Sequence, residues 1–225
     1  MNKKVWIIFF IVVIVILGGL VIWKRDVDNT NVDIDQLNPW QAITVEHLPD
    51  GEIPDHTDGS LDSKVTVIEY ADYACIHCAE LFPYIQAIQD EYRDRALFIY
   101  RNFSLGYPNS TVTQSAAEAA GLQGKFWEMH DQLFSDPTQW TGQIVTNRKE
   151  VLEGYASNVG LDIDKFRSDL EKPPTAVKNK IQRDKQLGLE AGVSGTPTFF
   201  VNGEKVELDS NGNSIRAAID KALKK

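Results

Sequence analysis

The chain has 225 residues and a formal net charge of −9, with 43% hydrophobic and 24% charged residues. This composition is ordinary for a globular protein, and the length allows one domain with a full core and a sizeable insertion. Residues 1–25 hold four basic side chains and no acidic one, so the remaining chain carries −13. A surface this acidic repels phosphate backbones and argues against nucleic-acid binding.

An apolar run close to the N-terminus predicts a membrane anchor. Residues 5–23 contain no charged side chain, and Trp6 and Trp23 stand near the two ends of the run. At about 1.5 Å per residue, a helix of this length spans roughly 28 Å, which is close to the apolar thickness of a bilayer. Tryptophan favours the two membrane interfaces. We therefore expect residues 5–23 to insert into the lipid bilayer as a single uncleaved helix.

A cleaved signal peptide is the alternative for this segment. Signal peptides usually have an apolar region of only about 7–15 residues, followed by a small-x-small cleavage site. Residues 20–23 offer no such site, which favours the anchor. Lysine or arginine flanks both ends of the run, so charge alone does not set the orientation. The short tail 1–4 favours a cytoplasmic N-terminus and a domain on the extracytoplasmic side of the cell membrane.

The next segments predict a tether followed by alternating strands and helices. Residues 24–60 are polar and rich in Asp, Asn, Pro and Gly, which is typical of a tether, with one short strand near its end. The pattern then predicts a buried strand over 65–70, a helix over 75–92 and a second strand over 96–103. Pro83 lies inside the predicted helix, where it is expected to produce a kink.

A long helical block separates these strands from the last ones. Residues 110–191 lack strand signals and contain several helical patterns divided by glycine and proline. Two short strands follow at 198–201 and 205–208, and Asn202-Gly203 between them is a strong hairpin signal. A helix over 214–223 closes the chain. This order of elements predicts an α/β domain with a helical insertion.

The two cysteines of the chain stand two residues apart at the head of the first predicted helix. A helix N-terminus carries unpaired N–H groups and positive potential, which lower the pKa of a thiol there. Cys75 comes first, so we predict that it is the more exposed sulfur and the nucleophile. Cys78 follows one turn later and is predicted to resolve a mixed disulfide. An exported domain with only this pair has no structural disulfide framework, so the pair is predicted to perform chemistry.

A structural disulfide and half of a zinc site are the alternatives for this pair. A zinc site needs further ligands, and the sequence contains no second CxxC pair and no HxxxH pair. We therefore expect no metal at this position.

Two more side chains are predicted to tune the cysteines. His77 lies between them, where an imidazole can donate a hydrogen bond or positive charge to Cys75, or can simply be solvated. Glu69 is the acidic residue of an otherwise apolar strand. Burial would raise the pKa of its carboxyl and let it exchange a proton with Cys78, unless it turns to solvent at the strand end.

Three motifs together resemble the DsbA-like branch of the thioredoxin superfamily over roughly residues 55–223. They are residues 67–78, residues 100–103 and residues 195–199. The resemblance implies a thioredoxin-like fold built from 61–109 and 192–225, with an inserted all-helical domain over 110–191.

The resemblance also assigns roles to single residues. It implies that Cys75 and Cys78 form a redox-active disulfide and that Glu69 is the buried acid of the family. Thr196 and Pro197 fall on a cis-proline loop that lies against the active-site sulfur and binds substrate backbone as an added strand. The chain departs from the family at Ile76, where members commonly have proline, and this leaves the oxidising strength open.

The predicted function is that of a membrane-anchored thiol–disulfide oxidoreductase that introduces disulfides into reduced exported proteins. It would need no cofactor, and a membrane-bound redox partner would reoxidise the cysteine pair. The alternatives are an extracytoplasmic disulfide reductase or isomerase and, among non-enzymes, a tethered substrate-binding or chaperone-like domain.

Overall fold

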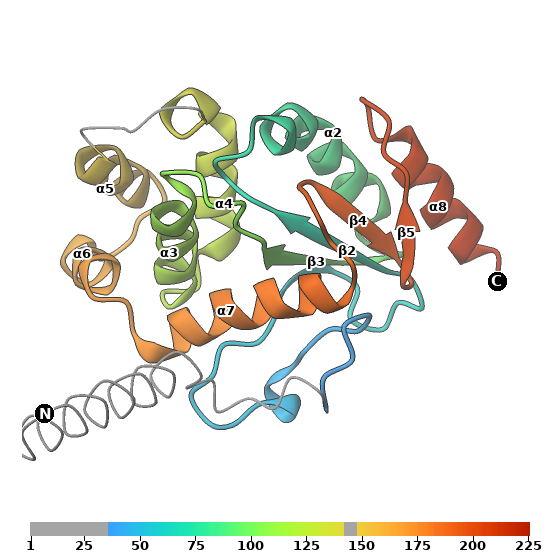
Figure 1. Ribbon diagram of the computed structural model, residues 1–225, viewed down its shortest axis with the longest axis horizontal. Helices are drawn as coiled ribbons and strands as arrows, with labels where there is room; N and C mark the ends of the chain where they lie inside the picture. Colours follow the sequence, from blue (N-terminus) through green and yellow to red (C-terminus); the bar gives the residue numbers. More distant parts are fainter. Residues whose placement is uncertain (1–35, 142–147) are drawn as a thin grey trace, which may run out of the picture. The chain divides into compact units, whose positions relative to one another are not determined.

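The computed structural model describes residues 36–141 and 148–225 (Figure 1). The predicted tail, the predicted anchor 5–23 and the first part of the predicted tether lie outside the described residues. Within the described ranges, no helix is both long enough and apolar enough to cross a membrane.

The centre of the fold is a five-stranded sheet with the strand order β1-β3-β2-β4-β5. Strands β2 and β3 pair in parallel, and the other three pairings are antiparallel. Each strand expected from the sequence is present, and the short strand expected near the end of the tether is the edge strand β1. The strands are β1 (His56–Gly59), β2 (Thr66–Ala71), β3 (Leu97–Asn102), β4 (Thr198–Val201) and β5 (Glu204–Val206).

The helices follow the expected order, with small differences at their ends. Helix α3 begins five residues earlier than its predicted core at residue 115, and α2 continues through Pro83 without interruption. Short 3-10 turns lie at Val45–His47 and Pro137–Gln139. The helices are α2 (Ile76–Tyr92), α3 (Ser110–Gly121), α4 (Phe126–Ser135), α5 (Arg148–Asn158), α6 (Ile163–Glu171), α7 (Thr175–Glu190) and α8 (Asn213–Leu223).

Both faces of the sheet are covered, as the apolar strand patterns predict. Helices α2 and α8 pack on the face that carries Val67, and α7 runs along the opposite face, which carries Ile68 (Figure 1). Helix α7 lies within the predicted insertion in the sequence, but it packs against the sheet and covers one of its faces. It approaches closely because Gly188 has no side chain, and a Cβ atom there would lie 2.5 Å from the ring of Phe103. The predicted insertion therefore divides into a sheet-covering helix, α7, and a separate group, α3–α6.

Helices α3–α6 pack around a second core, which they share with the start of α2 and with β3 and which includes the cysteines. Four alanines of α3 are fully buried, and their small side chains let neighbouring helices pack closely. Larger side chains fill the remaining space, and the same cluster includes Cys75 and Cys78. These larger core residues are Phe126, Met129, Leu133, Phe134, Trp140, Leu152 and Phe166.

The described end of the predicted tether packs against the sheet. The ring of Trp40 lies 4.9 Å from that of Phe200, and Ile43 is buried. Arg101 of β3 donates hydrogen bonds to two main-chain carbonyls of this segment, at 2.6 and 2.8 Å. Residues 36–55 therefore form part of the folded domain, because apolar and charged contacts hold them to its sheet.

A buried group of charges fixes this segment in place. Asp55 accepts a hydrogen bond from Arg101 at 2.8 Å, and Lys180 of α7 lies 3.6 Å from Asp55 and 2.6 Å from Asp184. All four side chains are fully buried. Burial alone would raise the pKa of Asp55, but the charges of Arg101 and Lys180 outweigh it and hold the pKa well below its usual range. Asp55 thus compensates two buried cations at once.

We predict that Asp55→Ala destabilises the fold by about 3–5 kcal/mol, because it removes the counter-charge of the buried Arg101 and one of the two carboxylates beside Lys180. Urea unfolding of the full chain measures this change. Lys149→Ala is the matched control, since it breaks an exposed pair with Glu171 and should cost less than about 1 kcal/mol. Because folding lowers the pKa of Asp55, its contribution is present above about pH 4 and is lost in stronger acid. A loss below 1 kcal/mol for Asp55→Ala would contradict the prediction.

Candidate active site

The cysteine pair lies where β2 ends and α2 begins. Cys75 is the N-cap residue of α2, with extended backbone angles, and Cys78 is in the first turn of the helix. The main-chain N–H of Cys75 donates to the carbonyl of Asp72 at 2.9 Å, which closes a tight turn between strand and helix. Both cysteines are free thiols. The local sequence therefore puts both sulfurs at the carboxyl end of the sheet's central strand.

The two thiols differ strongly in acidity. A hydrogen bond from Cys78 is the main cause that lowers the pKa of Cys75 to about 5, and the N–H groups of His77 and Cys78 at the start of α2 add to it. Burial raises the pKa of Cys78 well above its usual value. At neutral pH one sulfur is a thiolate and the other a thiol that supports it. This geometry supports the assignment of Cys75 as the nucleophile.

The accessible area of the whole residue does not separate the two cysteines, because both are 2% exposed. The sulfur of Cys78 nevertheless lies deeper than that of Cys75, in the direction that the sequence predicts. The loop before β4 covers Cys75, whose sulfur lies 3.4 Å from the carbonyl oxygen of Thr196 and donates a hydrogen bond to it when protonated. The difference in acidity therefore arises from the hydrogen bonds to the sulfur of Cys75 and from the deeper burial of Cys78.

The Thr196–Pro197 peptide bond is cis, as the resemblance implies. The hydroxyl of Thr196 has no other hydrogen-bond partner among the described residues, and it lowers the pKa of both cysteine sulfurs. The structure thus brings Cys75, Cys78 and Thr196 together from segments about 120 residues apart. The binding of substrate backbone by Thr196 and Pro197 stays a prediction.

The ring of His77 points into solvent. Its side chain is 75% exposed, and Nδ1 lies 3.1 Å from Oε2 of Glu80. His77 contributes its main-chain N–H to the site, and this N–H faces the sulfur of Cys75. An electronic effect of the imidazole on Cys75 stays a prediction.

Glu69 lies on the α2 face of the sheet, between Tyr100 of β3 and Phe199 of β4. Its side chain is partly buried, and desolvation raises the pKa of its carboxyl to about 8. Beside it is a small cavity of about 10 Å³, close to the minimum for one water, which Gln89 and Trp127 also line. Glu69 can therefore hold a proton at neutral pH, and its exchange of that proton with Cys78 stays a prediction.

Three residues near the pair were not singled out from the sequence. The carboxylate of Asp72 joins the turn at Cys75 to a distant loop, and the Tyr100 hydroxyl lies 3.4 Å from the carbonyl of Ala71. Tyr107 is close enough that the charges of Cys75 and Asp72 add to the effect of desolvation in raising its pKa. Asp72 and Tyr100 each stand in a motif that carries the family resemblance, whereas Tyr107 comes from a segment without such a signal.

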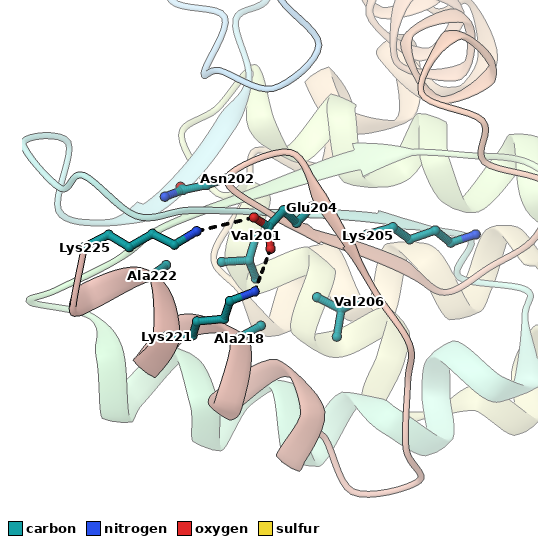
Figure 2. Close-up of a pocket in the computed structure, with 9 residues that line it drawn as sticks. All are labelled: Val201, Asn202, Glu204, Lys205, Val206, Ala218, Lys221, Ala222 and Lys225. Atoms are coloured by element: carbon teal, nitrogen blue, oxygen red, sulfur yellow. Dashed lines mark hydrogen bonds and ion pairs between the residues drawn. The ribbon is translucent and has the colours of Figure 1, made fainter.

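A larger hollow elsewhere in the domain is unrelated to this site. It has a volume of about 180 Å³ and lies between the β4–β5 hairpin and α8 (Figure 2). Lys221 and Lys225 both pair with Glu204 there, at 3.1 and 3.4 Å. Val201 pairs with Val67 at the start of β2, so the hollow is at the opposite end of the sheet from the cysteines. In the part of the chain that the structure describes, no cluster of three metal-ligating side chains occurs.

Comparisons with known proteins agree with this geometry. A family profile described as thioredoxin matches residues 52–221. A thioredoxin-like oxidoreductase from Silicibacter pomeroyi has a similar structure, with 28% identity, a TM-score of 0.63 and coverage of 76% of this chain and 93% of that one. BdbD from Bacillus subtilis has the same fold, at 22% identity and a TM-score of 0.65, over 82% of this chain and 97% of that one.

Curated sequence relatives carry a different name. The Na+/H+ antiporter NhaA 1 of Salinispora arenicola is 36% identical over 171 residues, which cover 75% of this chain and 25% of that protein. The chain spans about a quarter of the length of the curated relatives it matches. The antiporter name describes those much longer proteins.

We predict that alkylation of the reduced full chain at pH 6 modifies Cys75 alone, because only its thiolate is populated there. The alkylation rate should be half-maximal near pH 5. In Cys78→Ala the midpoint should rise toward the ordinary thiol value, because the main supporting hydrogen bond is gone. Mass spectrometry of iodoacetamide adducts against pH measures both. Equal modification of the two thiols would contradict the prediction.

Proposed function

This chain belongs to the thioredoxin family, and from that premise we propose that it is a membrane-anchored thiol–disulfide oxidoreductase that introduces disulfides into exported proteins. The observation that carries the proposal is the position of Cys75 at the start of α2, beside Cys78 and against the cis-proline loop at Thr196, where these contacts lower its pKa to about 5. A stabilised thiolate favours the reduced form of the pair, which makes its disulfide form oxidising. The likeness to an oxidoreductase of known structure supports the reaction class.

The proposed reaction begins with the pair as a disulfide. A substrate thiolate attacks the Cys75 sulfur, a mixed disulfide forms, and Cys78 leaves as a thiolate. Glu69 supplies the proton that neutralises Cys78, since its pKa near 8 keeps it protonated at neutral pH.

A second substrate thiolate then attacks the substrate sulfur of the mixed disulfide. The substrate disulfide forms, and Cys75 leaves as the stabilised thiolate. Two electrons have moved from the substrate to the cysteine pair. A membrane-bound redox partner would remove these electrons and restore the disulfide.

The location of the reaction is a further part of the proposal. The apolar run over residues 5–23 supports an anchor in the cell membrane with the cysteine pair on the extracytoplasmic side. Reduced exported proteins meet the pair there, in a compartment where disulfides persist.

We predict a reduction potential near about −120 mV for the full chain in detergent, titrated in glutathione buffers, because the Cys75 thiolate favours reduction of the pair. The same preparation should oxidise a reduced, unfolded ribonuclease, and Cys75→Ser should not. A potential near about −270 mV would instead identify a reductant. Retention of cellular activity by Cys75→Ser would favour the tethered chaperone-like alternative.

We predict that Glu69→Gln slows formation of the mixed disulfide about a hundredfold at pH 7, because glutamine has no acidic proton to give to Cys78. In the unsubstituted protein the acceleration of this step by Glu69 should fall as the pH rises above about 8, where Glu69 loses its proton. The variant should lack this pH dependence. Stopped-flow fluorescence with a cysteine peptide measures the step. Glu207→Gln, on the surface, is the matched control. Equal rates in both variants would remove Glu69 from the mechanism.

A further inference from the structure

Asp72 is a fully buried acid at the base of the turn that presents Cys75. Its Oδ1 accepts a hydrogen bond from the N–H of Ala74 at 3.0 Å, and its main-chain carbonyl accepts one from the N–H of Cys75 at 2.9 Å. The main-chain N–H of Asp72 faces the sulfur of Cys78 and lowers its pKa. Three groups of this one residue therefore fix the backbone that positions both sulfurs.

The second carboxylate oxygen of Asp72 binds a different part of the chain. Oδ2 accepts hydrogen bonds from the N–H of Leu105 at 2.9 Å and from the hydroxyl of Ser110 at 2.6 Å. Ser110 is the first residue of α3, where the helical insertion begins. We call the turn over residues 72–75 the redox turn. One buried carboxylate thus joins the redox turn to the start of the helical insertion, across 38 positions of sequence.

We infer that Asp72 is a positioning residue for Cys75, and that through Leu105 and Ser110 it couples the redox turn to the helical insertion. The inference rests on the proposed function for its consequence, which is the supply of a reactive thiolate. The thiolate depends on a hydrogen bond from Cys78 and on N–H groups at the start of α2, and hydrogen bonds weaken steeply with misalignment. A turn without its carboxylate anchor would hold these donors less well.

The direction in which the pKa of Cys75 changes distinguishes a positioning role of Asp72 from a purely electrostatic one. Asp72 is a negative group near the sulfurs, since its charge and that of Cys75 both raise the pKa of Tyr107. Removal of a negative charge by itself would favour the thiolate. Loss of positioning acts in the opposite direction. If Asp72 mainly positions Cys75, its removal must raise the pKa of Cys75.

The experiment measures the thiolate of Cys75 by its ultraviolet absorbance against pH, in the reduced full chain and in four variants. Asp72→Ala removes both the charge and the anchor. Asp72→Asn removes the charge and keeps an oxygen for Ala74, but it puts an NH2 donor where Oδ2 accepts from Leu105 and Ser110. Ser110→Ala keeps the charge and breaks only the bond to α3. Ser104→Ala is the matched control, because it loses a hydroxyl bond to Gly106 in the same loop without touching Asp72.

The two substitutions at Asp72 should differ in size. Asp72→Ala should lower the thiolate fraction at pH 5 about fivefold, which corresponds to a rise of one pKa unit from about 5. Asp72→Asn should lower the fraction less than Asp72→Ala does, because it removes the same charge but keeps the bond to Ala74. Ser110→Ala should lower it by a smaller factor, and Ser104→Ala should not change it. Circular dichroism of each variant checks that it is folded.

Two results would overturn the inference. An unchanged or higher thiolate fraction in Asp72→Ala would leave Asp72 as an electrostatic neighbour only. No difference between Ser110→Ala and Ser104→Ala would remove the coupling to the insertion, and this comparison remains decisive if Asp72→Ala fails to fold. The thiol titration needs no protein substrate. A chain that cannot oxidise proteins would therefore refute the proposed function without deciding the role of Asp72.

Discussion

The hydrogen bonding of β2 along both of its edges is the constraint on which the rest of the structure depends. Its pairing with β3 and β4 puts Glu69 on the α2 face and Ile68 and Tyr70 on the α7 face. The same pairing ends the strand at Ala71, so the chain must turn into α2 within a few residues. Cys75 stands at this turn because the sheet fixes where the strand stops. The strand pairing of the sheet thus sets the position of the nucleophile.

Electrostatics at the pair follow from that position. The start of α2 and the thiol of Cys78 support negative charge on Cys75, while burial keeps Cys78 protonated. Glu69 is close to the same helix but on the sheet, where desolvation keeps its proton at neutral pH. One side of the site therefore stabilises a thiolate and the other stores a proton. This division suits a dithiol that must break and form a disulfide in successive steps.

Buried charges connect the outer parts of the fold to the sheet. Arg101, Asp55 and Lys180 join β3, the segment before β1 and α7 into one group. Asp72 does the same on a smaller scale between the redox turn and α3. In both places a carboxylate receives donors from segments far apart in sequence, and its removal would leave these buried donors without that partner. The polar interior therefore fixes the relative positions of elements that the apolar core only brings together.

The sequence by itself determined the features that depend on neighbouring residues. These are the order of strands and helices, the hairpin at Asn202-Gly203, and the place of both cysteines at a helix start. Local backbone preference and apolar periodicity suffice for them. Only the tertiary structure decided that α7 covers the sheet, that residues 36–55 belong to the domain, and that Asp72 binds Ser110. These contacts join residues tens of positions apart, and their directions are set when the layers pack, so no local pattern specifies them.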